Sequence, residues 1–532
     1  MRRALPLSRA VLLLALFALP LLAQPRYGEV VEVRLIEVEA VVTDRDGNPV
    51  HGLTTNDFEI FEGRARQPIT NFVEYRGAEI TLTESDTGEA AAPAATPPPR
   101  TVILFIDGLP IHGRPRARTF EALRGFVEGL REEDRVGIVH WQVSINAGKT
   151  LLEPTTDRAS ALHVIDRIAG TASTDKASSS LEGDAAFLAA SDGTRGFDAD
   201  IESFLETGRR FQDEEHRVRM RRKTAALQRL VNSVGEAPGR KMILFVSQDF
   251  ALPAGGQARL AILPLFEKVA REANARGVTF YAVRPHQPDG LPTAMQTESP
   301  GVLNPAELQA QLAGLSALAD PTGGVIDFGP AGMENLGPQI ANDLGSYYSL
   351  GYRARSDGTD RERNVRVKMK NPEWRVRARR SYVEKSDETA ARDQLVARLF
   401  AEEDGGDLTF TLATGSPKAA RRNRSLVPVE MKIPVNQLQY EIDGGNRVAK
   451  VKVFVVAGNG IAEVTSIREE SFAIPAPPEG IADPVFTYSF ELLVDPKGSR
   501  VAVGLFDDRS GLAGFGGIDL RGEARQVDAS RR

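Results

Sequence analysis

TVILFIDGLPI, residues 101–111, is an apolar run rich in β-branched side chains that ends in one aspartate, Asp107, and a Gly-Leu-Pro break. A strand that is buried on both faces reads as such a run. In open α/β sheets, ligands bind beyond the carboxyl ends of the strands, which is where Asp107 would lie. We therefore expect any functional site of this chain to be built around that edge of a sheet.

Three later runs repeat the pattern: RVGIVHW at residues 135–141, KMILFVS at 241–247 and GVTFYAV at 277–283. Helix-like segments alternate with them, and the amphipathic stretch 258–276 is the clearest. Four strands that alternate with helices over the length of one domain indicate a parallel sheet covered by helices. The sequence therefore predicts an α/β fold with a doubly wound, mostly parallel central sheet.

The order of these segments resembles the von Willebrand factor A (VWFA) family, and in particular bacterial VWFA-related proteins of the acidobacterial type. The resemblance covers about residues 30–385. The segments that carry it are FIDGLP (105–110), the predicted helix 115–131, EEDRVGIVHW (132–141), LEPTTDRASALHVIDRI (152–168), RKMILFVSQDF (240–250), SYYSLGYRA (346–354) and RNVRVKMKNPEWRVRARRSY (363–382).

In family members that bind metal, the resemblance implies a Mg²⁺ site in which an Asp-x-Ser-x-Ser loop, a threonine and a later aspartate hold the ion. An acidic residue of the partner takes the open position. Here Leu109 and Ile111 stand where the serines would be, and Gln248 stands where the later aspartate would be, with Asp249 one residue further on. Since Mg²⁺ requires oxygen ligands in good geometry, we expect a degenerate metal-ion-dependent adhesion site (MIDAS) that binds no ion tightly.

The loop threonine would be Thr171 or Thr174. We expect no cofactor, although Mg²⁺ or Ca²⁺ remains possible through Asp107, Asp249 and main-chain oxygens. The Asp107 carboxylate is expected to accept hydrogen bonds from the amides of the turn that follows it. The predicted partner-binding edge consists of Asp107, His112, Gln248 and Asp249.

Other motifs favour structural roles. His140 lies in an apolar strand, which is typical of a core histidine, and the basic run 217–223 is interpreted as one face of a solvated helix. The cluster DRDGN at residues 44–48 has turn chemistry, and it lacks the distal glutamate of an EF-hand. No G-x-S-x-G, H-E-x-x-H or Walker-type motif is present, so the sequence favours a protein that is not an enzyme.

The N-terminus indicates export. Three arginines within the first nine residues precede the short apolar segment 10–23, which ends in a small residue, Ala23, as in a secretory signal peptide. The apolar core is shorter than a membrane span. The predicted divisions are a signal peptide (1–23), an N-terminal β-sandwich-like module (28–83), a Pro/Ala-rich linker (84–99), a VWFA-like domain (100–385) with an insertion (170–215), a connecting helix and linker (386–407) and a C-terminal β-sandwich-like domain (408–525).

The 532 residues carry a formal charge of −6, are 42% hydrophobic and include no cysteine. This charge gives no reason to expect nucleic acid as a partner. We therefore predict an exported protein of the periplasm or extracellular space that binds an unknown protein partner or acts as a scaffold, without stable membrane insertion after signal cleavage. Two alternatives remain open at this point: a metal-dependent adhesion module, and a hydrolase whose site lies in the insertion 170–215.

Overall fold

The computed structural model describes residues 33–520 except 78, 83–98, 108–112, 143–146, 172–197, 236, 238, 248–255, 286–304, 330–331, 356–357, 400–404, 421–423, 459–463, 466, 479 and 495–499. The predicted signal peptide and nearly all of the predicted linker therefore lie outside the described residues, and so do His112, Gln248 and Asp249. Within the described helices, none combines the length and the apolar character needed to cross a membrane.

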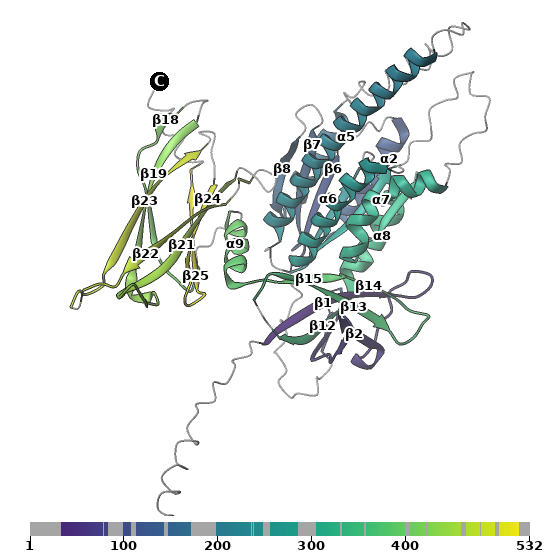
Figure 1. The fold of residues 1–532 in the computed structure, drawn as a ribbon. Helices are drawn as coiled ribbons and strands as arrows, with labels where there is room; N and C mark the ends of the chain where they lie inside the picture. Colours follow the sequence, from purple (N-terminus) through teal and green to yellow (C-terminus); the bar gives the residue numbers. More distant parts are fainter. Residues whose placement is uncertain are drawn as a thin grey trace, which may run out of the picture.

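A six-stranded sheet forms the centre of the molecule, in the order β11-β10-β9-β6-β7-β8 (Figure 1). All neighbouring strands are parallel except β8, which runs antiparallel to β7. Numbered from its own first strand, the order is 3-2-1-4-5-6, that of a doubly wound sheet. The strands are β6 (Thr101–Asp107), β7 (Arg135–Gln142), β8 (Ala147–Thr155), β9 (Lys241–Val246), β10 (Val278–Pro285) and β11 (Ile326–Gly329).

Helices cover both faces of this sheet, which explains why its strands are apolar throughout. In β6, Val102, Leu104 and Ile106 point into one core cluster, and Ile103 and Phe105 point into the other. The first face is covered by α2 (Gly113–Glu128), α3 (Arg158–Gly170) and α8 (Gly332–Gly345). The second is covered by α5 (Asp198–Val234), α6 (Gly256–Ala275) and α7 (Pro305–Thr322).

Helix α5 is longer than the sequence indicated. The predicted insertion ends at residue 215 and the basic run of the predicted helix follows it, whereas α5 begins at Asp198 and projects well beyond the sheet (Figure 1). Phe204 and Phe211 indicated helical turns within the predicted insertion, but the sequence did not show that these turns continue into the basic segment as one helix. Residues 198–215 therefore belong to a helix of the α/β domain.

Two further antiparallel sheets form the N-terminal β module, with strand orders β14-β1-β12-β4-β5 and β15-β13-β2-β3. The turn at residues 44–48 is stabilised by Asp44, whose carboxylate accepts hydrogen bonds from the main-chain amides of Asp46 (2.9 Å) and Asn48 (2.8 Å). The strands are β1 (Val33–Thr43), β2 (Phe58–Glu62), β3 (Ala65–Gln67), β4 (Asn71–Arg76), β5 (Glu79–Leu82), β12 (Ser346–Arg355), β13 (Arg361–Met369), β14 (Arg375–Ala378) and β15 (Ser381–Glu384).

This module differs from the predicted division of the chain. In that division, residues 347–382 belong to the VWFA-like domain (100–385). Instead, β12 and β14 both pair with β1, and β13 pairs with β2. The aromatic core is likewise shared, since the rings of Phe58 and Phe72 both pack against Tyr348. The α/β domain is thus inserted between two halves of one β module.

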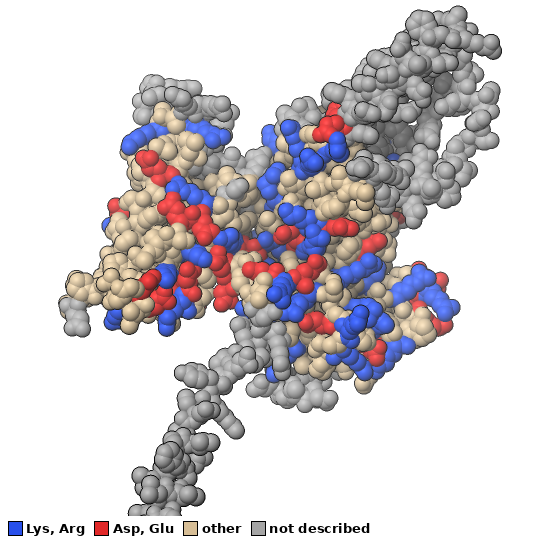
Figure 2. All heavy atoms as spheres, viewed as in Figure 1, with Lys and Arg blue, Asp and Glu red and all other residues tan. Residues whose placement is uncertain are grey.

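The C-terminal β module consists of two antiparallel sheets that share an apolar core. Helix α9 (Asp387–Arg398) packs on one of them through Leu395. Charged side chains of both signs gather where this module meets the rest of the molecule (Figure 2). The strands are β16 (Gly405–Gly406), β17 (Thr411–Thr414), β18 (Lys418–Ala420), β19 (Arg424–Pro434), β20 (Glu441–Asp443), β21 (Asn446–Gly458), β22 (Arg468–Pro475), β23 (Val485–Val494), β24 (Arg500–Asp507) and β25 (Ala513–Asp519).

Candidate functional site

The carboxyl ends of β6 and β9 lie side by side, and there the chain diverges. After β6 it runs to α2 on one face of the sheet, and after β9 it runs to α6 on the other. Such a topological switch point is where ligands bind in open α/β sheets. The register pairs Ile106 with Val246, so that Asp107 and Ser247 are the next residues of the two neighbouring strands at this edge.

These two residues meet a third from α5. The Asp107 carboxylate is buried, and its Oδ2 accepts a hydrogen bond from Ser247 Oγ at 2.6 Å. The same oxygen lies 2.6 Å from Lys223 Nζ, whose side chain is only 1% exposed. The ammonium also lies 5.9 Å from the centre of the Trp141 ring, within the range of a cation–π contact. We call Asp107, Lys223 and Ser247 the edge cluster.

Helix α5 brings Lys223 to the edge cluster through its apolar side. Met220, Leu227 and Leu230 are fully buried against the sheet, and Lys223 lies three residues after the first and four before the second, on the same side of the helix. Our interpretation of the run 217–223 as a solvated face is therefore wrong for Lys223, because Arg221 and Arg222 are exposed but the lysine is not. The spacing of Lys223 within the apolar stripe is the signal that could have identified it.

The described residues around Asp107 do not fit a divalent cation. Mg²⁺ binds carboxylate oxygens at about 2.0–2.1 Å and requires a near-octahedral shell of oxygens. Here the ammonium of Lys223 already contacts the oxygen that would bind the ion. Among the residues that the structure describes, no group of three or more His, Cys, Asp or Glu side chains is arranged to hold a metal.

The other predicted site residues are partly visible. Thr171 ends α3, and its hydroxyl donates to the carbonyl of Arg167 at 2.9 Å, while Thr174 lies outside the described residues. His140 is half-buried in β7. Burial lowers the pKa of its imidazole, and the charge of Arg116 lowers it further. The neutral form of His140 is therefore favoured, as expected for a histidine that packs in a structural role.

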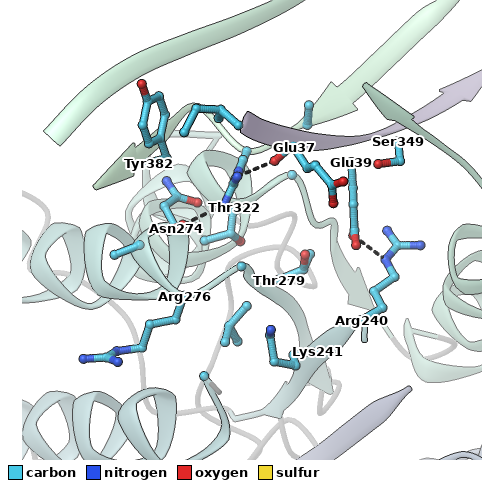
Figure 3. Close-up of a pocket in the computed structure, with 18 of the residues that line it drawn as sticks. Glu37, Glu39, Arg240, Lys241, Asn274, Arg276, Thr279, Thr322, Ser349 and Tyr382 are labelled. Atoms are coloured by element: carbon cyan, nitrogen blue, oxygen red, sulfur yellow. Dashed lines mark hydrogen bonds and ion pairs between the residues drawn. The ribbon is translucent and has the colours of Figure 1, made fainter. Parts of the chain in front are cut away.

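A second candidate is a cavity of about 800 Å³ at the opposite, amino edge of the sheet, between the α/β domain and the N-terminal β module. Figure 3 shows Arg240 facing Glu39 of β1, with Lys241 and Arg276 nearby on the side of the α/β domain. Arg240 Nε lies 3.0 Å from Glu39 Oε2, and the arginine also donates to the main chain of Asp343.

The cations around this cavity have structural partners. Arg377 of β14 contacts both carboxylate oxygens of Asp343 in α8, at 2.6 and 2.8 Å. Lys241 Nζ lies 3.3 Å from the carbonyl of Ala237, just after α5, and Arg379 Nη1 lies 3.1 Å from that of Asn274 in α6. Cations at the C-terminal ends of helices are favourable in themselves. The cavity is thus a charged join between two modules, and the edge cluster is the better candidate site.

No protein-family model matches the sequence, and no curated protein matches it either. Among solved structures, an aerotolerance-related membrane protein from Bacteroides fragilis aligns with 46% of this chain and 98% of its own, at 11% identity and a TM-score of 0.25. Manganese-loaded TRAP protein from Plasmodium vivax aligns with 62% and 86%, at 9% identity and a TM-score of 0.24.

The VWA domain of SpRpn10 aligns with 46% of this chain and 93% of its own, at 12% identity and a TM-score of 0.21. Similarity at this level carries no functional argument.

Proposed function

We propose that this chain is an exported, non-enzymatic protein that binds a protein partner or acts as a scaffold, built on a VWFA-like domain between β-sandwich-like modules. The observation that carries the proposal is the edge cluster at the switch point. Its carboxylate accepts a hydrogen bond from Ser247 and forms an ion pair with buried Lys223. A carboxylate held in this way supports a binding surface and is poorly suited to serve as a general base.

The proposal of export rests on the N-terminal arginines and the apolar segment 10–23. The proposed contact surface is the carboxyl edge of the central sheet. It consists of Asp107 together with His112, Gln248 and Asp249, which follow β6 and β9 in the sequence. Loops at this edge are held by a rigid sheet, which is the usual arrangement for binding residues in α/β domains.

The first test concerns metal dependence. We expect the melting temperature of the purified mature chain to be the same in millimolar Mg²⁺ and in EDTA, because the Lys223 ammonium already neutralises Asp107. Differential scanning calorimetry measures this directly. A rise in melting temperature with Mg²⁺ that disappears in Asp107→Ala would instead favour the metal-dependent adhesion module.

The second test concerns the surface. Partners are captured from the native periplasm or medium on the immobilised chain and quantified by mass spectrometry, always in EDTA. Asp249→Ala should lose the specific partner. Glu132→Ala is the matched control, because it removes an exposed carboxylate at the opposite edge of the same sheet. Equal recovery on both variants would overturn the assignment of the surface.

A further inference from the structure

We infer that Lys223 is a tethered cation, a side chain of the protein that takes the position which a divalent ion would occupy at the switch point. This inference rests on the proposed function, since it explains how a VWFA-like site works without metal. It begins from one contact: Lys223 Nζ lies 2.6 Å from Asp107 Oδ2, and both side chains are almost completely buried.

An ion and the lysine would compete for the same oxygen. Mg²⁺ on Asp107 Oδ2 would lie about 2.0–2.1 Å from it, and therefore at most about 5 Å from the ammonium. Two cations at that separation in a buried site repel each other strongly, because little water is present to screen them. Binding of a divalent ion thus requires the ammonium to leave.

The surroundings hold the ammonium in place. The lysine stem leaves α5 between Met220 and Leu227, both fully buried, so the side chain is confined by packing. At its tip, the ring of Trp141 lies 5.9 Å from Nζ, and Ser247 Oγ donates to the same carboxylate oxygen as the lysine. The position of the cation is therefore set by the fold, as metal ligands set the position of an ion.

Removal of the ammonium should leave a site for a small cation. Lys223→Ala would keep the Asp107 carboxylate and the Ser247 hydroxyl around the volume that the lysine stem filled. Oxygen ligands of this kind select compact, hard cations. The cavity left in Lys223→Ala should therefore bind a primary alkylammonium, which restores both the charge and the volume of the lysine. It should bind a divalent cation more weakly.

The experiment measures melting temperature for the wild type, Lys223→Ala and Lys223→Met. We expect Lys223→Ala to melt roughly 10 °C lower, because the buried Asp107 carboxylate loses its ion pair with Lys223. Ethylammonium chloride at about 100 mM should recover several degrees in this variant alone, in keeping with binding to the folded state. Tetramethylammonium chloride at equal ionic strength, which donates no hydrogen bond, should recover none.

Lys223→Met is the matched control, since methionine fills the stem volume and should leave no room for ethylammonium. Equal stability of wild type and Lys223→Ala, or a folded Lys223→Ala that ethylammonium does not stabilise, would overturn the inference. If Lys223→Ala does not fold, the inference is tested on the wild type by measuring which lysines an amine-acylating reagent modifies. Lys223 should then stay unmodified while Lys432, whose side chain is 55% exposed, reacts, and reaction of both at one rate would overturn the inference.

The two proposals can fail independently. Rescue by ethylammonium reports on the edge cluster alone and involves no partner. Loss of partner capture by Asp249→Ala reports on the surface and requires no change in stability. If ethylammonium stabilises Lys223→Ala but Asp249→Ala still captures the partner, the proposed binding surface is refuted and the assignment of Lys223 stands.

Discussion

The two edges of the central sheet both contain buried ion pairs, but they are built differently. At the carboxyl edge, the ammonium of Lys223 contacts Asp107 Oδ2, and both residues belong to the α/β domain. At the amino edge, arginines contact both oxygens of their partners: Arg100 with Asp134, just before β6 and β7, and Arg377 with Asp343, between β14 and α8.

The difference follows from the chemistry of the two cations. The planar guanidinium of arginine matches a carboxylate with two parallel hydrogen bonds, which suits a fixed join between elements. The ammonium of lysine is a compact point charge, and it resembles a bound ion more closely. The arginine pairs thus hold neighbouring structural elements together, whereas Lys223 places a positive charge next to Asp107 at the switch point.

The largest expected effect is at the carboxyl edge. Asp107→Asn removes the charge that compensates Lys223 and should lower the free energy of unfolding by about 3–5 kcal/mol. Urea unfolding in a Trp374→Phe background isolates this domain, because the chain has two tryptophans and Trp141 then reports alone. The double variant Asp107→Leu with Lys223→Met should recover most of the loss, since an apolar pair has no buried charge to compensate. If Asp107→Asn lowers the free energy of unfolding by less than about 1 kcal/mol, the expected difference between the two edges of the sheet is refuted.

A smaller effect is expected at the amino edge. Asp343→Asn weakens the two contacts to Arg377 and the hydrogen bond from the Tyr281 hydroxyl at 2.9 Å. We expect a loss of about 1.5–3 kcal/mol, the range for hydrogen bonds to charged groups. Trp374 lies in the N-terminal β module, so its fluorescence should shift together with that of Trp141 if the pair joins the two modules. A shift of the Trp141 signal alone would show that the join is local.

The smallest effect is the dependence on pH. Burial opposes ionisation of Asp134, but the hydrogen bond and charge of Arg100 outweigh it and hold the pKa below its ordinary value of 3.8. A carboxyl whose pKa is lower in the folded state stabilises the protein above its unfolded pKa, and this contribution disappears as the pH falls through the folded value. We therefore expect the urea midpoint to decrease as the pH is lowered below about 4, and to decrease less steeply in Asp134→Asn. Parallel curves for the two proteins would count against the assignment.

Much of the α/β domain could be predicted from the sequence, because a strand buried on both faces leaves a continuous apolar run and the residue after it falls at the edge of the sheet. This reasoning identified the position of Asp107. It missed Lys223, because a lysine that follows four arginines within seven residues is usually solvated, and only its place in the apolar stripe of α5 distinguishes it.

The partners of β12–β15 were missed for a different reason. Alternating residues indicate that a segment forms a half-buried strand, but they do not indicate which strand it pairs with. The pattern at residues 363–369 is the same whether β13 extends the central sheet or pairs with β2. The pairing is determined by contacts between residues that are far apart in the sequence, such as Val367 of β13 opposite Ile60 of β2.

The insertion of the α/β domain into the N-terminal β module determines the order in which the parts of this chain can fold. All strands of the central sheet lie within residues 101–329, so that domain can form from a growing chain, whereas Tyr348 must reach Val50 across 298 residues. Until then, β1 and β4 have no partner in β12 and expose hydrogen-bonding edges prone to aggregation. The folded domain shortens this search, since it brings residues 100 and 345 to the same side of one compact body and reduces the entropy lost on closing the loop. A nascent chain interrupted before residue 346 would therefore carry a finished domain and an unfinished module.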